Sequence, residues 1–197
     1  RHLRNIVIIQ ADVLAMPSRQ CFDYAFSIGV LHHTSSPRGA FDSVVATLKE
    51  GGAVSAWVYG RENNGWIIYL LNPLRRHQTS RLPRGILGIL AYAIAAPMFL
   101  ILYCIYRPVG RFPQLAWLRR YLFYFDYLFF LTKIKFHEQA LIIFDHLVPS
   151  IAEYIHRDDF ARWFEENALE GIVLTSRAGN SWCGFGLRSA STQKHTD

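Results

Sequence analysis

The sequence is poor in cysteine and in charged residues. Its three cysteines, Cys21, Cys104 and Cys183, lie far apart and form no C-x-x-C pair. This spacing argues against a disulfide framework and against a cysteine-based metal site, so we expect a reducing, cytoplasmic environment and no bound metal. Charged residues make up 18% of the 197 positions, against about 25% in an average soluble domain. The chain is therefore more apolar than most enzymes.

The sequence also lacks internal repeats and low-complexity tracts. Its length corresponds to one domain, or to one domain with an insertion. The chain begins with Arg1 rather than Met, and an apolar run starts at Asn5 with no signal peptide before it. We therefore expect a chain that is truncated at its N-terminus. The polar tail, residues 189–197, is predicted to be disordered.

Positive charge is concentrated in the middle of the chain. The formal net charge is +6, and residues 61–137 hold eleven Lys/Arg against two Asp/Glu. Residues 1–60 hold five and four, and residues 138–197 hold five and nine. Because the basic stretch is also the most apolar, it suits an anionic membrane surface better than a nucleic-acid groove. We expect no nucleic acid partner, and a cytoplasmic protein that is peripheral or integral to the inner face of the membrane.

Two apolar segments lie in this basic region. Residues 86–106 form a run of 21 residues without a charge, which is long enough to span a bilayer. The arginines that flank it are Arg75, Arg76, Arg81, Arg84, Arg107 and Arg111. The second segment, residues 121–131, is interrupted by Asp126 and is too short to span. Basic residues flank both segments, so no charge asymmetry orients a span, and a transmembrane helix, a monotopic hairpin and a buried helical cap all stay open.

Short apolar runs near the N-terminus predict parallel strands. The runs, bounded by polar or glycine positions, are residues 5–10, 22–28 and 52–59. Residues 37–49 place apolar side chains at three-and-four spacing, which predicts a helix. Ser35 or Ser36 would cap this helix, and Gly51-Gly52 would end it. Strand, helix and strand in this order predict a right-handed βαβ unit.

An α/β pattern returns near the C-terminus. A helix is predicted from Asp158 or Asp159 to about Asn167, followed by a hairpin whose turn is Gly179-Asn180. The strands of the hairpin are residues 171–176 and 182–188. The predicted parts of the chain are a core segment 1–60, a hydrophobic and basic helical insertion 61–157, a closing helix and hairpin 158–188, and the tail 189–197.

Several short motifs follow one another along the chain: Ala11-Asp12-Val13 with Met16-Pro17, Phe22-Asp23, Ile28 through His33, and Leu48 through Gly52. Their order and spacing resemble the C-terminal two-thirds of a class I S-adenosylmethionine-dependent methyltransferase. Residues 158–188 are similar to the family's closing pair of antiparallel strands. The resemblance implies an α/β fold, with a partial Rossmann-like methyltransferase sheet of three parallel strands plus a C-terminal antiparallel hairpin, and a large hydrophobic helical insertion.

The resemblance also implies S-adenosyl-L-methionine as cofactor and assigns residues to it. Asp12 matches the acidic position that accepts a hydrogen bond from the adenine amino group, and Val13 matches the neighbour that packs on the base. Ser27, Ile28 and Gly29 match the end of the central strand, beside the methionine part. Ligands of open parallel sheets bind outside the carboxyl ends of the strands, where these residues fall. Alternatively, Asp12 is an ordinary loop or cap carboxylate.

Candidate catalytic and acceptor-binding residues lie at the ends of neighbouring segments. His33 matches the family's usual histidine after the central strand, and His33 or His156 could act as a general base. A histidine in this loop more often only hydrogen-bonds backbone. Tyr59, Asp145 and Tyr154 are candidates for binding the acceptor substrate, although Asp145 could instead cap a turn.

The sequence departs from the family in one large respect. The family's glycine-rich turn and its ribose-binding acid should both lie upstream of Arg1. For the chain as given we expect weak or no cofactor binding and no activity. The function expected of the protein is methyl transfer to a small, hydrophobic, lipid-like or membrane-associated acceptor. The alternative is a non-catalytic, membrane-peripheral binding or scaffold protein built on a degenerate methyltransferase core.

Overall fold

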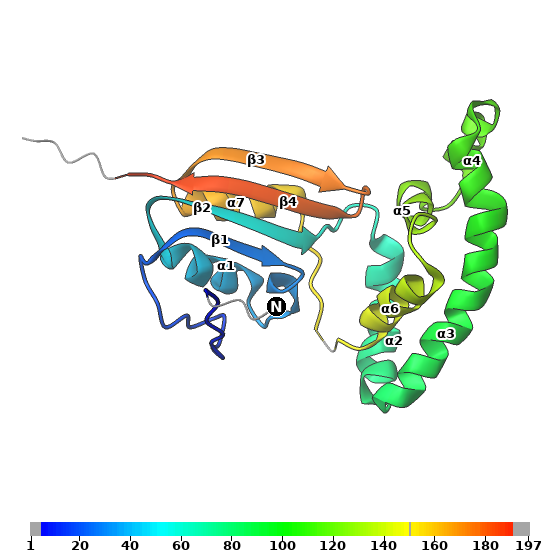
Figure 1. Ribbon diagram of the computed structural model, residues 1–197, viewed down its shortest axis with the longest axis horizontal. Coiled ribbons are helices and arrows are strands. Elements are labelled where there is room, and N and C mark those ends of the chain that lie inside the picture. The colour runs from blue at the N-terminus through cyan, green and yellow to red at the C-terminus, as the bar shows by residue number, and fades with distance from the viewer. Residues whose placement is uncertain (1–4, 150, 191–197) are drawn as a thin grey trace, which may run out of the picture. The chain divides into compact units, whose positions relative to one another are not determined.

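The computed structural model describes residues 5–149 and 151–190, so most of the predicted tail lies outside the described residues (Figure 1). The chain divides into two units. The sheet unit comprises Arg1–Val58, Asp158–Thr175 and Cys183–Asp197, and the helical unit comprises Tyr59–Arg157 and Ser176–Trp182. Each unit is described by itself below.

A four-stranded mixed sheet is the centre of the sheet unit (Figure 1). Its strands are β1 (Phe22–Ile28), β2 (Leu48–Tyr59), β3 (Leu169–Arg177) and β4 (Ser181–Arg188). They lie in the order β1-β2-β4-β3, with β1 and β2 parallel. The α/β prediction and the C-terminal hairpin are therefore confirmed.

The strand predicted over residues 5–10 is not formed. This segment is irregular, and the side chains of Ile6, Val7, Ile8 and Ile9 are 56% to 93% exposed. In the described part of the chain, β1 pairs with β2 on one side and with no strand on the other. An apolar run becomes a strand only when a neighbour accepts and donates its ladder hydrogen bonds. Two of the three predicted parallel strands are therefore observed.

Helix α1 (Pro37–Ala46) connects the two parallel strands. Ser36 is the N-cap, and its Oγ accepts a hydrogen bond from Gly39 N at 3.2 Å. The helix ends three residues earlier than predicted, because the Thr47 hydroxyl donates to Val44 O at 2.7 Å and the chain turns directly into β2. Strand, helix and parallel strand form the expected βαβ unit.

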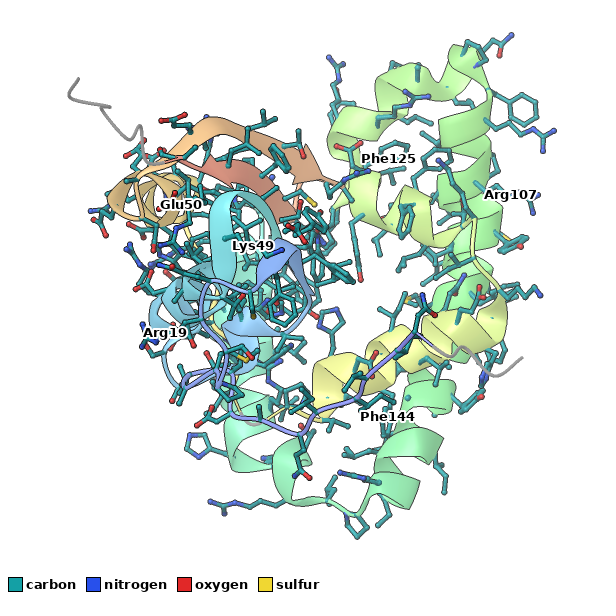
Figure 2. The ribbon with its side chains drawn as sticks, turned by 60° about the vertical axis from the view of Figure 1, so that its left-hand side comes forward. Arg19, Lys49, Glu50, Arg107, Phe125 and Phe144 are labelled. Carbon is teal, nitrogen blue, oxygen red and sulfur yellow. The ribbon has the colours of Figure 1, made fainter. Side chains whose placement is uncertain are left out.

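Gly51-Gly52, predicted to end the helix, instead lies within β2. The register of β1 against β2 shifts near the start of both strands, which marks a bulge. Gly51 has φ +73°, and a Cβ on Gly52 would lie 2.9 Å from the Lys49 carbonyl oxygen. Lys49, labelled in Figure 2, also donates to Asp23 Oδ1 at 2.8 Å and so ties the bulge to β1.

Helices α1 and α7 (Arg157–Glu166) cover one face of the sheet (Figure 1). The Phe41 ring of α1 lies 4.7 Å from the Phe164 ring of α7, and β4 approaches both Phe160 and Phe164 through Gly184. Exposed apolar side chains on the other face of β1 are Phe22, Tyr24, Phe26 and Ile28.

Helices and turns make up the described part of the helical unit. Its helical elements are η2 (Ile67–Leu71), α2 (Asn72–His77), η3 (Thr79–Arg81), α3 (Arg84–Ile101), η4 (Leu102–Tyr106), α4 (Arg107–Arg111), η5 (Pro113–Tyr121), α5 (Phe125–Leu131) and α6 (Phe136–Leu147). The short turn η1 (Leu31–His33) belongs to the sheet unit. Helix α6 packs along α3, as Figure 1 shows. Leu102, Tyr106 and Leu131 form a buried cluster where η4 meets α5.

One helix is long and apolar enough to cross a membrane by length and composition. It runs without a break through α3, the π-helical turn η4 and α4, over Arg84–Arg111, and its most apolar window has a mean hydropathy of 2.3 and is 22% buried. A soluble core helix would be mostly buried. This helix buries one face only.

Candidate functional site

The residues that match the cofactor's methionine end lie at the carboxyl end of β1. Ser27 is buried and pairs in register with Ala56 of β2, while Ile28 is 68% exposed. Gly29 follows with φ +73°, a conformation that L side chains rarely adopt. Its N–H donates to Trp57 O at 3.4 Å. The structure therefore brings these three predicted residues together at one edge of the parallel pair.

Two histidines follow in the short turn η1. His32 is fully buried, and its ring lies 4.3 Å from the His33 ring and 5.8 Å from that of Trp57. His33 is half-buried, and its N–H donates to Val30 O at 2.9 Å. The candidate base His33 thus lies beside the His32 ring, four residues after Gly29.

The turn that holds Asp12 is separate in sequence from this strand end. Asp12 Oδ1 accepts a hydrogen bond from Leu14 N at 2.9 Å, and Asp12 O accepts one from Ala15 N at 3.0 Å. Met16 N donates to Ser43 Oγ at 3.1 Å, which fixes the turn against α1. Asp12 is exposed and Val13 is half-buried. One carboxylate oxygen of Asp12 therefore caps the turn, as the ordinary interpretation expected, on a side chain that solvent and a ligand can reach.

These features fit the cofactor that the resemblance implies. At Gly29 a Cβ would meet only the Trp57 ring, at 3.5 Å, so the backbone on the other side is open to close approach. A carboxylate is the group that an adenine amino group needs as acceptor. Asp12, with Val13 beside it, and the strand end Ser27–Gly29 are the residues of this chain that could hold S-adenosylmethionine.

The acceptor-binding candidates of the helical unit gather around Tyr59. Ile155 N donates to Tyr59 O at 2.9 Å, and Gly60 and Ile155 form a parallel bridge, so Tyr154 is placed beside Tyr59. The Tyr59 ring stacks on Tyr154 at 5.5 Å and on His146 at 5.9 Å. A contact between residues about one hundred positions apart thus forms a stack of three rings.

Burial keeps the tyrosines of this region, Tyr59, Tyr154 and Tyr124, in their neutral form. Burial is the largest cause of the raised pKa of Tyr59; the negative charge of Asp145 raises this pKa further, and the positive charge of Arg75 lowers it. Burial raises the pKa of Tyr124 to about 12 and also raises the pKa of Tyr154. The hydroxyl groups therefore stay protonated at neutral pH and can donate hydrogen bonds.

Arg75, expected to flank the apolar run as part of a basic rim, is instead 1% exposed. One Nη donates to Asn72 Oδ1 at 2.5 Å, and the other donates to His146 O at 3.3 Å. The guanidinium thus holds α2 against the end of α6, next to His146 of the ring stack. It contributes no surface charge.

Asn64 joins the cluster to the hairpin turn and is a residue that the sequence did not single out. It is 2% exposed, and its amide donates to Gly60 O at 2.6 Å and Asn180 O at 2.7 Å. Its carbonyl oxygen accepts from the Tyr124 hydroxyl at 2.5 Å. No local pattern marks Asn64, because two of its partners lie 60 and 116 positions away.

Glu62 is a second residue that sequence reasoning missed. It accepts hydrogen bonds from Arg157 N and from the Trp182 indole N–H, both at 2.8 Å. Burial raises the pKa of the Glu62 carboxyl, but these hydrogen bonds and the nearby His156 lower it more, so that the net shift is downward. His156 Nδ1 lies 3.6 Å from Glu62 Oε1, and the His156 side chain is 50% exposed. An ionised carboxylate therefore lies next to the second candidate base.

A hollow of about 380 Å³ lies on the Tyr124 side of the cluster. Its lining includes Asn63, Phe123, Tyr124, Phe125, Tyr127 and Gly179. This volume falls in the lower part of the roughly 300–1,000 Å³ range of small-molecule sites.

Comparison with known proteins found one family model that matches the N-terminal part of the chain. Residues 1–56 match the family model described as "Methyltransferase domain", whereas a comparison with curated proteins gave no match. Among solved structures, the chain is similar to an O-methyltransferase family protein from Burkholderia thailandensis, with 10% identity and a TM-score of 0.44 over 93% of this chain and 36% of that one. It is also similar to a SAM-dependent methyltransferase from Thermotoga maritima, with 9% identity and a TM-score of 0.46 over 94% of this chain and 66% of that one. The chain thus spans 36% and 66% of the lengths of these two proteins. Residues 1–56 of this chain are therefore similar to a methyltransferase domain.

Proposed function

We propose that the protein transfers a methyl group from S-adenosylmethionine to a small, hydrophobic or membrane-borne acceptor. The observation that carries the proposal is the family match over residues 1–56, on a segment that puts Gly29 with its positive φ at the carboxyl end of β1. S-adenosylmethionine supplies an electrophilic methyl group on a sulfonium, and the acceptor's nucleophilic atom takes that group.

The sheet unit would hold the cofactor. Asp12 accepts a hydrogen bond from the adenine amino group, and Val13 packs on the base. The backbone at Ser27–Gly29 lies along the methionine part, because a positive-φ glycine at a strand end leaves no side chain in the way. These contacts bind and orient, and orientation is the main need of a reaction whose acceptor is already nucleophilic.

The helical unit would bind the acceptor through aromatic surface. The half-buried Tyr59 and Tyr154 offer aromatic surface and protonated hydroxyl groups, and the hollow beside Tyr124 is lined by further aromatic side chains. Such a surface favours an acceptor with a ring or an apolar chain and one polar group. The negative charge of Asp145 also raises the pKa of Tyr59.

A hydroxyl acceptor would need a base as well. His156 is suited to this role because the Glu62 carboxylate, 3.6 Å from Nδ1, orients the ring while half of the side chain stays accessible. General base catalysis contributes about 10²- to 10⁴-fold to a rate. A His156→Gln variant should therefore lose kcat by about that factor. His33 is the alternative base, and His33→Gln would show the same loss if it carried the proton.

Binding of the cofactor tests the proposal directly. The protein, expressed from its complete gene, is titrated with S-adenosylmethionine by calorimetry, and transfer of a labelled methyl group into a membrane lipid extract is then followed. Asp12→Asn should weaken binding by roughly tenfold or more, because a hydrogen bond to a charged acceptor is worth about 1.5–3 kcal/mol. Asp23→Asn is the matched control, since Asp23 is an exposed carboxylate at the opposite end of β1, paired with Lys49. A wild-type protein that binds no cofactor would overturn the proposal.

A further inference from the structure

We propose that the outer face of the long helix α3-η4-α4 is a membrane-binding surface that lies flat in the headgroup region of an anionic bilayer. This inference is independent of the proposed reaction. It concerns the side of the helix that points away from α6.

The two sides of α3 differ in burial but not in polarity. The side facing α6 carries Leu87, Ala91 and Ala95, which are at most 2% exposed, and the two alanines let α6 approach closely. The exposed apolar side chains on the rest of the helix, 44% to 72% accessible, are Ile86, Ile89, Ile94, Leu100, Ile101 and Ile105. A helix that faces water carries polar residues there. A continuous exposed apolar stripe marks an interaction surface instead.

Positive charge at both ends of the apolar stripe favours an anionic lipid surface as its partner. Arg84 begins the helix and Arg111 ends it, and both are exposed. Arg107, which Figure 2 labels on this helix, lies with its guanidinium 4.6 Å from the Tyr103 ring. Residues 61–137 hold eleven basic against two acidic side chains. A second copy docked on the same face would bring these arginines together, whereas anionic lipid headgroups neutralise them.

An aromatic segment extends the surface beyond α4. Trp117 is 59% exposed, Tyr121 is 66% exposed, and Arg120 lies over the Tyr121 ring at 4.6 Å. Tryptophan and tyrosine concentrate at the level of the lipid headgroups, where an amphipathic ring meets both apolar chains and water. These side chains suit the same headgroup region as the arginines at the helix ends.

The packing of α6 favours a flat helix over a spanning one. If α3 crossed the bilayer, α6 would be carried into the hydrocarbon beside it, together with the exposed Glu138 and Asp145. A hydrogen bond between the Tyr92 hydroxyl and His137 would lie there too. Ionisable side chains are unfavourable at that depth. A helix lying in the interface keeps α6 on the water side.

Flotation with vesicles tests the surface. The wild-type protein from the complete gene should float with phosphatidylcholine vesicles that contain 30% phosphatidylglycerol, float less with pure phosphatidylcholine, and dissociate as salt rises. Ile89→Gln with Leu100→Gln should abolish flotation. Val173→Gln with Leu187→Gln is the matched control, because both side chains are exposed apolar groups on the hairpin. Equal loss in both pairs, or no loss in the helix pair, overturns the proposal.

Charge variants test the choice of partner. Arg107→Gln with Arg111→Gln should weaken binding to the anionic vesicles by roughly tenfold or more, because each basic residue near such a surface contributes about 1 kcal/mol. Arg19→Gln with Arg177→Gln removes the same charge from exposed positions outside the helix and should have little effect. A different result would overturn the proposal: the wild type is a dimer in light scattering and does not bind vesicles, and Ile89→Gln with Leu100→Gln makes it a monomer. The face would then bind a second copy.

Depth distinguishes a flat helix from a spanning one. Ala93 is exposed at the middle of the apolar run, and it can carry a fluorescent label as Ala93→Cys once Cys21, Cys104 and Cys183 are replaced by serine. Quenchers near the headgroups should then reduce the fluorescence more than quenchers at the ends of the acyl chains. Stronger quenching from the bilayer centre, together with retention in carbonate at high pH, would overturn the flat arrangement.

Discussion

Gly184 lies where β4 passes under α7, and we predict that Gly184→Ala destabilises the sheet unit by about 3 kcal/mol, near the upper end of the roughly 1–3 kcal/mol range for overpacked cores. A Cβ built on Gly184 would lie 2.4 Å from Phe164 Cζ and 2.9 Å from Phe160 Cε1. Carbon atoms in contact prefer about 3.5–4.0 Å, so at least one ring has to move by about 1 Å.

Neither ring has room to move. Phe160 and Phe164 are both fully buried, and their centroids lie 5.2 Å apart in an edge-to-face arrangement. The Phe164 ring also lies 4.7 Å from the Phe41 ring of α1. The added methyl group must therefore push α7 away from the sheet, which loosens the contact with α1 as well.

Urea unfolding followed by far-UV circular dichroism measures the effect. Gly88→Ala is the matched control, because a Cβ at Gly88 meets no atom within 4 Å and a helix interior gains about 1 kcal/mol from this exchange. Adding Phe164→Leu to Gly184→Ala should restore part of the loss, since the smaller side chain makes room. A Gly184→Ala protein as stable as the wild type, or a double variant with strictly additive losses, would refute the packing described for α7 on β4.

Three further outcomes follow from the helical unit. Burial raises the pKa of Tyr124 to about 12 in the folded protein, so the stability that the protonated hydroxyl contributes is fully present below pH 10 and should be lost as the pH rises from 10 to about 12. Urea midpoints at pH 9, 10 and 11 measure this loss, and Tyr124→Phe should reduce the dependence of the midpoint on pH. Asn64→Asp places a carboxylate against the Gly60 and Asn180 carbonyl groups and should cost about 3 kcal/mol, whereas Asn63→Asp at an exposed position should cost less than half as much in the same assay. Gly110→Ala would put a Cβ 2.0 Å from the Phe129 ring, so it should lower the thermal midpoint, and an unchanged midpoint would contradict the contact between α4 and α5.

Local patterns predicted the elements whose hydrogen bonds close within a few residues. Ser36 followed by Pro37 marks the start of α1 because the cap bond reaches only three positions along the chain. The hairpin turn at Gly179-Asn180 is equally local, and Gly179 has the positive φ that such a turn requires. The prediction that Gly51-Gly52 ends the helix was wrong because the role of this pair depends on a distant strand. Glycines end helices and also form bulges, and only the register of β1 against β2 decides between the two.

Long-range partners explain what the sequence could not show. Residues 5–10 have the composition of a buried strand, but strand formation depends on a neighbour that lies elsewhere in the chain. Glu62 and Asn64 likewise look like ordinary polar residues of a loop. Their roles depend on partners at Arg157, Trp182 and Asn180, between 95 and 120 positions away.

The helical unit inverts the usual relation between polarity and burial. Arg75 is 1% exposed while Ile89 is 72% exposed, and composition alone assigns both to one basic and apolar region without saying which lies inside. The burial of the guanidinium is compensated in part because its two Nη atoms donate to Asn72 Oδ1 and His146 O. An exposed isoleucine on a helix without polar neighbours has no such compensation within the unit. Within one stretch of sequence, Arg75 therefore joins α2 to the end of α6 from the inside, whereas the exposed apolar face of α3 is the surface that we propose binds a membrane.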